Sequence, residues 1–478
     1  MLFNSFQFFL FFPIVTLLYY LIPYKFRWLH LLVASCIFYC AFIPVYIFIL
    51  FFTIIIDYFA GLIISKSAGR KRKWWLIASL VSNIGVLAFF KYYNFFVENF
   101  NSFLHSAHIS YSTIPFLAII LPIGLSFHTF QAMSYTIEVY RGNQLPEKHF
   151  GIYALYVMYY PQLVAGPIER PQHMLHQFHE HHDPVPSEIG SGLRLMAWGY
   201  FKKMVVADHL ALYVDKVFDD PGQYHGFPIM ASVLFFTFQI YCDFSAYTDI
   251  ARGASRVMGI QLMRNFNFPY FSRSIREFWT RWHLSLSSWF RDYLYIPLGG
   301  NKTNVQRWCF NIMVVFVISG LWHGANWTFI VWGALHGIYL IAGRFKDFIG
   351  QKYLKSIRFS LPRYLDVITV FLLVSFGWIF FRAKNLHVAF RVIRQSFTGL
   401  NWRNPGLTSG IVNKTNFVII AISLLAMLFI EMFVFRYKGY QRFLQLNKNV
   451  RLFCYIILCL TIVTFGIFNS SKFIYFQF

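Results

Sequence analysis

The sequence predicts an all-α protein that crosses a membrane many times, and three observations lead to this fold class. Of the 478 residues, 57% are hydrophobic and only 13% are charged, whereas soluble domains average about 45–50% and about 25%. The apolar residues gather in runs long enough for spans of about 20 residues each. The 42 basic and 19 acidic residues are too few to cover the several soluble domains that this length would otherwise form. Soluble, disordered and disulfide-rich secreted proteins are therefore excluded.

Hydropathy predicts about 11–13 apolar segments. The first lacks a preceding basic residue and a small-residue cleavage site, so we expect a retained span and not a cleaved signal peptide. The expected segments lie at 6–21, 29–45, 47–64, 74–97, 114–137, 150–166, 191–212, 228–248, 309–322, 327–343, 364–381, 416–435 and 451–468.

The net charge of +23 does not indicate a nucleic-acid partner, because the basic residues separate apolar runs and do not line one soluble face. Lys and Arg collect instead in cytoplasmic loops of membrane proteins. Basic loops near 25–27, 70–73 and 141–148 follow one another at two-span intervals, while loop 98–113 has no Lys or Arg. This pattern predicts an external N-terminus. The basic loop 382–415 is expected to contain an amphipathic surface helix.

Neither cysteines nor histidines signal a metal site. The six cysteines lie in or beside apolar runs without CxxC spacing, so we expect reduced core residues. A histidine-rich loop could bind metal, but prolines bracket it and its spacing is irregular, so we expect a solvated loop and no metal. Its histidines are His173, His176, His179, His181 and His182.

The middle third of the chain is expected to hold the functional site. Its spans are short and polar, and prolines at 167, 171, 269 and 297 interrupt them. Backbone that leaves regular helix at membrane depth must be buried in protein or line a water-filled cavity.

The first candidate constellation is the stretch 319–327, with His323 inside an apolar run. An ionisable residue in a membrane helix is costly and indicates function. Gly320 and Gly324 flank it, and two interpretations remain open: they let a substrate approach the imidazole, or they are helix-packing glycines. His336 lies roughly 220° round a continuous helix from His323 and is interpreted as structural.

The second constellation lies at 264–300. Arg276, Trp279, His283 and Ser287 recur at helical spacing and predict one polar helix face. Arginines beside a membrane cavity suit phosphate groups. An interfacial helix with Trp at headgroup level and snorkelling Arg is the alternative, and it fits the arginines better when each is taken singly.

Other catalytic signatures are missing from the sequence. It contains no Walker loop, GxSxG elbow or aspartate-rich sugar-nucleotide motif. Histidine remains the best general base near neutral pH.

At these constellations the chain resembles the membrane-bound O-acyltransferase (MBOAT) family, in particular its bacterial polysaccharide O-acetyltransferases. The likeness extends over nearly the whole chain. It rests on MLFNS at 1–5, LPIGLSF at 121–127, GPIER at 166–170, YCDFSAYTD at 241–249, the stretch 276–300 and WHG at 322–324.

The resemblance implies a single membrane domain, with N-terminal spans over 1–150, a catalytic core over 151–345 and C-terminal spans over 346–478. It also implies a ring of tilted and re-entrant helices around a central tunnel. The family's near-invariant histidine corresponds to His323, the general base, and its second polar position to His283, which hydrogen-bonds the thioester carbonyl or orients the acyl group. The residues expected to line the substrate site are Arg276, Trp279, Trp282, Ser287, Trp322 and Asn326.

The implied reaction moves an acetyl group from a cytoplasmic thioester, acetyl-CoA, to a hydroxyl of an extracytoplasmic polysaccharide or partner protein. No permanently bound cofactor is expected. The implied setting is the inner (plasma) membrane, in contact with its lipid, and the implied partner is a periplasmic or membrane-anchored acetyltransferase or esterase-like protein.

Two alternatives stay open. One is a D-alanyl transfer protein of the same superfamily. The other is a carrier or flippase, for which broken helices and polar groups at the membrane centre are also typical. The sequence-based criterion for the enzyme is that His283 and His323 share one cavity, without a further buried acidic pair that would couple transport.

Overall fold

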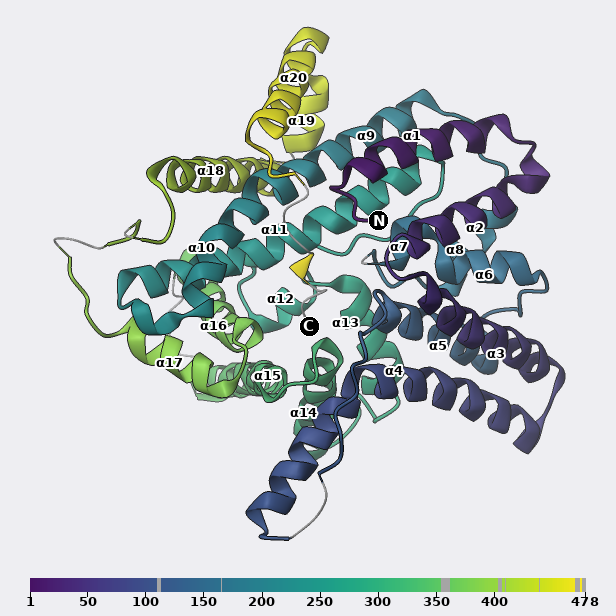
Figure 1. Cartoon of the computed structure of the whole chain (residues 1–478), viewed down its shortest axis with the longest axis horizontal. Coiled ribbons are helices and arrows are strands. Elements are labelled where there is room, and N and C mark those ends of the chain that lie inside the picture. Colours follow the sequence, from purple (N-terminus) through teal and green to yellow (C-terminus); the bar gives the residue numbers. More distant parts are fainter. Residues whose placement is uncertain are drawn as a thin grey trace. The chain divides into compact units, whose positions relative to one another are not determined.

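A computed structural model describes residues 1–109, 113–164, 166–353, 362–402, 406–408, 410–437, 439–468 and 473–474, with the side chains of 347–353, 437 and 440 left out. Within these ranges all regular structure is helical, which confirms the all-α prediction (Figure 1).

Eight helices of the described chain are long and apolar enough to cross a membrane, which confirms a multi-pass protein. They are η1–α3 (Pro44–Lys66), α4 (Gly69–Ser106), α11 (Phe227–Val257), α14 (Val305–His323), α15 (Trp327–Tyr353) over its part Trp327–Lys346, α16 (Arg363–Arg382), α18 (Lys414–Tyr437) over Lys414–Arg436, and α20 (Lys448–Phe465). The apolar helix α1 (Phe6–Leu21) is shorter.

Five expected segments in the first half of the chain do not form long apolar helices: 6–21 and 29–45 give the shorter helices α1 and α2 (Tyr24–Cys40), and three others are interrupted. In the segment 114–137 the backbone is irregular until α5 (Leu125–Arg141), which follows Gly124 at φ +79°. The segment 150–166 gives α6 (Phe150–Met158) and then the one-turn helix α7 (Tyr160–Leu163) with a proline at its start. The segment 191–212 runs through α9 (Pro186–Tyr200), a π-helix over Phe201–Ala207 and α10 (Asp208–Asp219).

The chain divides into two compact units, one comprising 1–194 with 251–263 and the other 195–250 with 264–478. In the first unit, α3 packs against α4 and α5, and α2 (Tyr24–Cys40) packs against α6 (Figure 1). In the second unit, α14 and α15 form a tight hairpin, α16 packs on α15, and α18 and α20 pack on the π-helix.

The basic loops of the first unit lie together at one end. Arg72 donates hydrogen bonds to the last main-chain carbonyls of α5. Arg27 donates to the carbonyl oxygen of His182 in the histidine loop, 2.6 Å away, and His179 of the same loop pairs with Glu147 at 2.8 Å. The loops near 25–27, 70–73 and 141–148 therefore share one side, as the charge pattern predicted.

The amphipathic helix expected in 382–415 is also present. It is α17 (Leu386–Ser396), and Ala389, Val392 and Ser396 form its buried face. It packs against α16, and the spacing of its buried residues is that of a helix lying on a surface.

Candidate active site

His323 is the last residue of α14, and its side chain is only 5% exposed. Aromatic rings from three helices surround the imidazole. The ring centroids of Trp322, Trp332 and Phe381 lie 4.9, 5.0 and 5.1 Å from that of His323. The aromatic walls exclude bulk water, and electrostatic interactions of the imidazole are correspondingly stronger.

The glycines beside His323 serve helix packing. A Cβ on Gly320 would stand 2.2 Å from the carbonyl oxygen of Phe329, and a Cβ on Gly324 would stand 2.1 Å from the same residue's ring. Across the hairpin, a Cβ on Gly333 would stand 2.2 Å from the carbonyl oxygen of Phe316. The backbones of α14 and α15 therefore touch here, so the helix-packing interpretation of these glycines holds and they do not open the imidazole to a substrate.

His283 lies in a break between two short helices, which corrects the prediction of one continuous polar helix face over 276–287. The helix α12 (Ile275–Trp279) ends before it, and α13 (Leu284–Phe290) begins after it. His283 has φ +45°, a left-handed conformation unusual for a residue with a side chain. Asn265 accounts for the break, because its main-chain oxygen accepts from Leu284 N and its side-chain oxygen accepts from Ser285 N.

The contacts of Asn265 also fix the tautomer of His283. Asn265 Oδ1 accepts from the main-chain N–H of Ser285 at 3.2 Å, so this atom is the amide oxygen. The Nδ1 of His283 lies 3.1 Å from the same oxygen and must donate to it. In the neutral ring Nε2 is then an acceptor.

The protonation state of His283 follows from its burial. The side chain is fully buried, and desolvation lowers the pKa of His283 to about 3. A neutral ring whose one N–H is bonded to Asn265 has no N–H left for a thioester carbonyl. This geometry favours the orienting role over the carbonyl-binding role.

Within the second unit, His283 and His323 both contact the same aromatic residue, Trp322. The Trp322 ring lies 6.2 Å from the ring of His283 and 4.9 Å from that of His323. Phe244 of α11 contacts His283 from another direction, with ring centroids 4.6 Å apart. Residues from separate helices thus converge on the pair.

The remaining predicted site residues lie nearby in different settings. Trp282 is buried and stacks against Phe278, whereas Arg276 is exposed. Ser287 donates to the carbonyl of Trp282. The amide of Asn326 donates to the carbonyl of Lys384 and accepts from Thr328 N, so it fastens the start of α15.

Trp279 packs against His336, at a ring distance of 5.1 Å. His336 is fully buried, and neither of its ring nitrogens hydrogen-bonds to any residue that the structure describes. Trp332 lies 5.1 Å from this ring and 5.0 Å from that of His323. The helix does not run straight through, as α14 ends at His323 and α15 starts at Trp327. The rotation of roughly 220° expected along one continuous helix therefore does not apply to His323 and His336. Both rings contact Trp332.

Buried acidic residues do occur in the second unit, contrary to the sequence-based criterion against a carrier. Lys203 of the π-helix pairs with Asp208 at 2.8 Å and with Asp243 at 2.7 Å, and all three are nearly fully buried. The neighbouring Lys202 pairs with Asp249 at 2.8 Å. Lysines compensate these carboxylates. Because buried acidic residues are present, their expected absence does not distinguish an enzyme from a carrier here.

The histidine loop is built from histidine–carboxylate pairs. His173 lies 2.8 Å from Glu169, and the hydrogen bond to this carboxylate raises the pKa of His173. The fully buried Glu169 also accepts from the main-chain N of Met263 at 2.6 Å, so it ties the loop to another segment of the same unit. The pairs are His173–Glu169, His176–Glu180, His179–Glu147 and His181–Asp183.

Sequence reasoning missed Asn265 as a site residue. It is 18 positions before His283 in an irregular segment, and no helical or strand period relates the two. The one available signal was a pair of asparagines, Asn265 and Asn267, among the aromatic residues of 264–271.

Comparisons with known proteins agree with this architecture. A model of the family described as MBOAT, membrane-bound O-acyltransferase family, matches residues 149–381. The chain is 37% identical over 443 residues to the probable alginate O-acetylase AlgI of Azotobacter vinelandii, with 91% of this chain and 85% of that protein covered. It is 36% identical over 400 residues to the peptidoglycan O-acetyltransferase of Helicobacter pylori, with 78% and 74% covered. Identity to the teichoic acid D-alanyltransferase of Bacillus subtilis is 28% over 283 residues, with 55% and 69% covered. The chain therefore belongs to the membrane-bound O-acyltransferase family and is an O-acyltransferase.

Proposed function

We propose that the chain transfers an acetyl group from acetyl-CoA at the cytoplasmic face to a hydroxyl of an extracytoplasmic polysaccharide. The observation that carries this proposal is that the rings of His323 and His283 both contact Trp322 in a buried aromatic cluster. The names of the relatives support acetyl as the acyl group and a glycan as the acceptor, because the two compared above at 36–37% identity are an alginate O-acetylase and a peptidoglycan O-acetyltransferase.

In the proposed reaction, His323 removes the proton from the acceptor hydroxyl as its oxygen attacks the thioester carbonyl carbon. The C–O bond forms, the C–S bond breaks, and the CoA thiolate leaves and takes up the proton. His283 orients the acyl group, because its one N–H is bonded to Asn265 and leaves no donor for the thioester carbonyl. A general base contributes about 10²–10⁴ in rate.

The thioester itself supplies the driving force, so the transfer needs no nucleotide hydrolysis. A tunnel that joins the two membrane faces at the histidines belongs to this proposal, as do the inner membrane as location and a periplasmic or membrane-anchored esterase-like partner that passes the group to the polymer. Lipid surrounds the spans, and the chain itself holds no permanent cofactor in this scheme.

The direct test uses the purified full chain with acetyl-CoA labelled in the acetyl group, together with the partner and a polysaccharide acceptor. Wild-type protein should release CoA and label the acceptor. His323→Ala should reduce transfer at least about a hundredfold, as expected for loss of the general base. His283→Ala should leave measurable transfer, because His323 still accepts the proton. Unchanged CoA release in His323→Ala at equal protein abundance would show that His323 is not the general base.

The same assay distinguishes acetyl transfer from the alternative, D-alanyl transfer. The label released from the acceptor by mild base is acetate if acetyl-CoA is the donor. Transfer from a D-alanyl carrier thioester, with no transfer from acetyl-CoA, would replace the acetyl proposal. A substrate that moves across a vesicle membrane unchanged, with the thioester intact, would contradict acyl transfer altogether.

A further inference from the structure

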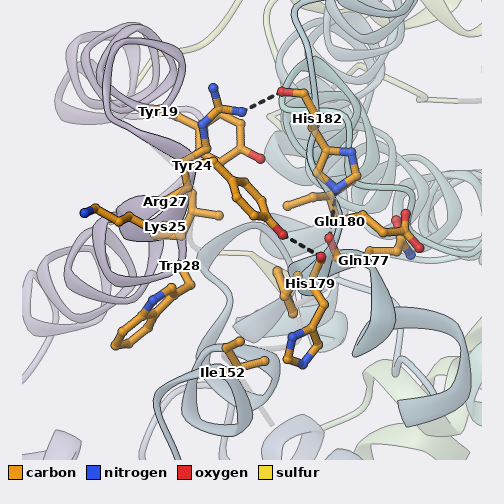
Figure 2. A pocket seen from close by; sticks show the side chains of 13 residues that line it. Tyr19, Tyr24, Lys25, Arg27, Trp28, Ile152, Gln177, His179, Glu180 and His182 are labelled. Carbon is orange, nitrogen blue, oxygen red and sulfur yellow. Dashed lines mark hydrogen bonds between the residues drawn. The ribbon is translucent and has the colours of Figure 1, made fainter. Parts of the chain in front are cut away.

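A cavity of about 180 Å³ lies in the first unit between the start of α2 and the histidine loop (Figure 2). It is distant in sequence from both catalytic candidates, and its walls come from Tyr24, Arg27, Trp28, Ile152, His179 and His182. A site needs only about 10–15 Å³ to admit one water. This cavity therefore has room for a group of several atoms together with water.

Arg27 is a buried charged residue in the wall of this cavity. Its side chain is 8% exposed, and two of its N–H groups donate to the carbonyls of Ile22 and His182. A guanidinium has five N–H donors. Among the described residues no ion pair joins Arg27 to a carboxylate, and besides the two carbonyls Arg27 hydrogen-bonds the side chain of Tyr19, which leaves donors of the guanidinium for a ligand. A buried charge without a counter-ion is costly, and an anion in the cavity would offset that cost.

The carboxylate of Glu180 does not neutralise the charge of Arg27, and the positive charge of Lys25 lies elsewhere. Glu180 also lines the cavity, but it is exposed and lies 3.8 Å from His176. The Lys25 side chain extends away from His179 and His182 in Figure 2, and its ammonium lies over the ring of Phe26. Arg27 therefore carries the positive charge that faces the loop.

The walls of the cavity are held in place by close packing. The rings of Tyr19 and Tyr20 lie 4.9 and 5.7 Å from the guanidinium carbon of Arg27. A Cβ on Gly151 would stand 2.1 Å from the Trp28 ring. Gly259, at φ +83°, would place a Cβ 2.8 Å from His182. Glycines at these two positions let Trp28 and His182 approach, so the cavity keeps its shape.

The surroundings indicate what kind of anion fits. Tyrosine and tryptophan cluster at the level of lipid headgroups. The apolar side chains of Leu21 and Phe26, which are close in sequence to the cavity residues, are 69% and 48% exposed. The cavity lies at the end of the unit where the three basic loops meet. Guanidinium groups bind phosphate through paired N–H donors.

We propose that this cavity binds the phosphate group of a phosphate ester, with Arg27 as its principal ligand. Two sources carry this chemistry: the headgroup of an anionic lipid, and a soluble phosphate ester such as CoA. The proposal does not depend on the acetyl-transfer proposal, because binding is measured without turnover. His323→Ala should bind the phosphate ligand normally even where it abolishes transfer.

The test measures the thermal midpoint of the full chain in a neutral detergent while ligand is added. One arm uses short-chain phosphatidylglycerol against the matching uncharged diacylglycerol, and the other uses CoA. A saturable rise with phosphatidylglycerol alone identifies a lipid site, and a rise with CoA alone identifies a soluble phosphate ester. No rise with either ligand overturns the proposal.

The variants test the role of Arg27 itself. Arg27→Gln should weaken the affinity about ten- to a hundredfold, the range expected for losing a charge-assisted hydrogen bond. Lys25→Gln removes the same charge from a side chain directed elsewhere, and its affinity should stay within about threefold of wild type. Equal losses in the two variants would indicate a diffuse charge effect and overturn the site.

A second variant covers the case in which Arg27→Gln does not fold. Ile152→Phe narrows the cavity and leaves every charge in place. It should lower the affinity for the same ligand as well. Unchanged affinity in this variant would show that the ligand binds elsewhere.

Discussion

The immediate surroundings of His283 decide what that residue can do. Three donors converge on the side-chain oxygen of Asn265: the N–H of Ser285, the hydroxyl of Ser285 and the Nδ1 of His283. Together with the low pKa that burial gives His283, they define a neutral ring with one known tautomer. The ring is therefore held in place with its one N–H bonded, which suits a residue that orients the acyl group.

Replacing Asn265 should therefore impair transfer without removing either histidine. In Asn265→Ala the acceptor of Nδ1–H is lost, and a misplaced catalytic group costs about 10²-fold in rate. The measurement is the acetyl-transfer rate at matched membrane abundance. Ser285→Ala is the control, because it removes one donor to the same oxygen but keeps the contact between Asn265 and His283. If both variants fall equally, Asn265 only supports the loop.

His173 gives the molecule a pH-dependent contact. Its hydrogen bond to the buried Glu169 raises the pKa of His173 above the ordinary value of about 6.5. A raised folded-state pKa means that this stabilisation is fully present below about pH 6.5 and is lost as the pH rises through the folded pKa. The thermal midpoint of wild type should therefore exceed that of His173→Gln most at acidic pH. A difference that grows toward alkaline pH would contradict this assignment.

At the scale of elements, the hairpin of α14 and α15 carries His323 and depends on backbone contact. Gly320 and Gly333 face one another across it, because a Cβ on Gly333 would approach the Cα of Gly320 to 3.4 Å as well as the Phe316 carbonyl. Small residues are the usual means by which membrane helices come this close. The position of His323 among its aromatic neighbours follows from this packing.

A methyl group in that contact should destabilise the protein. Gly333→Ala forces the helices apart, and overpacking of this kind costs about 1–3 kcal/mol. Gly343→Ala is the matched control in the same helix, since nothing lies within 4 Å of its Cβ and alanine favours a helix interior by about 1 kcal/mol. The thermal midpoint in detergent should fall for the first variant and stay or rise for the second. Equal midpoints would refute the packing argument.

At the scale of the whole molecule, the charge pattern predicts the orientation in the membrane. The basic loops of the first unit lie together at one end, and Lys and Arg are retained on the cytoplasmic side. The phosphate cavity lies at this end too. In the proposed reaction the acetyl donor enters from the same face, and the acceptor polysaccharide lies on the opposite side.

Labelling of single cysteines in intact cells tests this orientation. In a background with the six native cysteines replaced, Arg70→Cys should resist an impermeant thiol reagent and His105→Cys should react. Both should react after the membrane is made permeable, which controls for access. Labelling of position 70 but not of position 105 would reverse the predicted orientation.

The sequence by itself determined the fold class, the shared side of the basic loops and the choice of His323 and His283 as candidates. These follow from local properties, because hydropathy, charge and residue type can be read along one segment at a time. The expected spans at 114–137, 150–166 and 191–212 were wrong as continuous apolar α-helices. A proline and a left-handed glycine break the first two, and the third contains a π-helix with two buried lysines.

Only the tertiary structure decided the details of the site. Asn265 breaks the helix that periodicity predicted through His283, and the glycines near His323 face α15 instead of a substrate. Asp243 is compensated by Lys203, 40 positions away in the chain, which no local pattern reveals. Each of these outcomes depends on a contact between separate elements, and the energy of such a contact depends on which groups the fold brings within bonding distance.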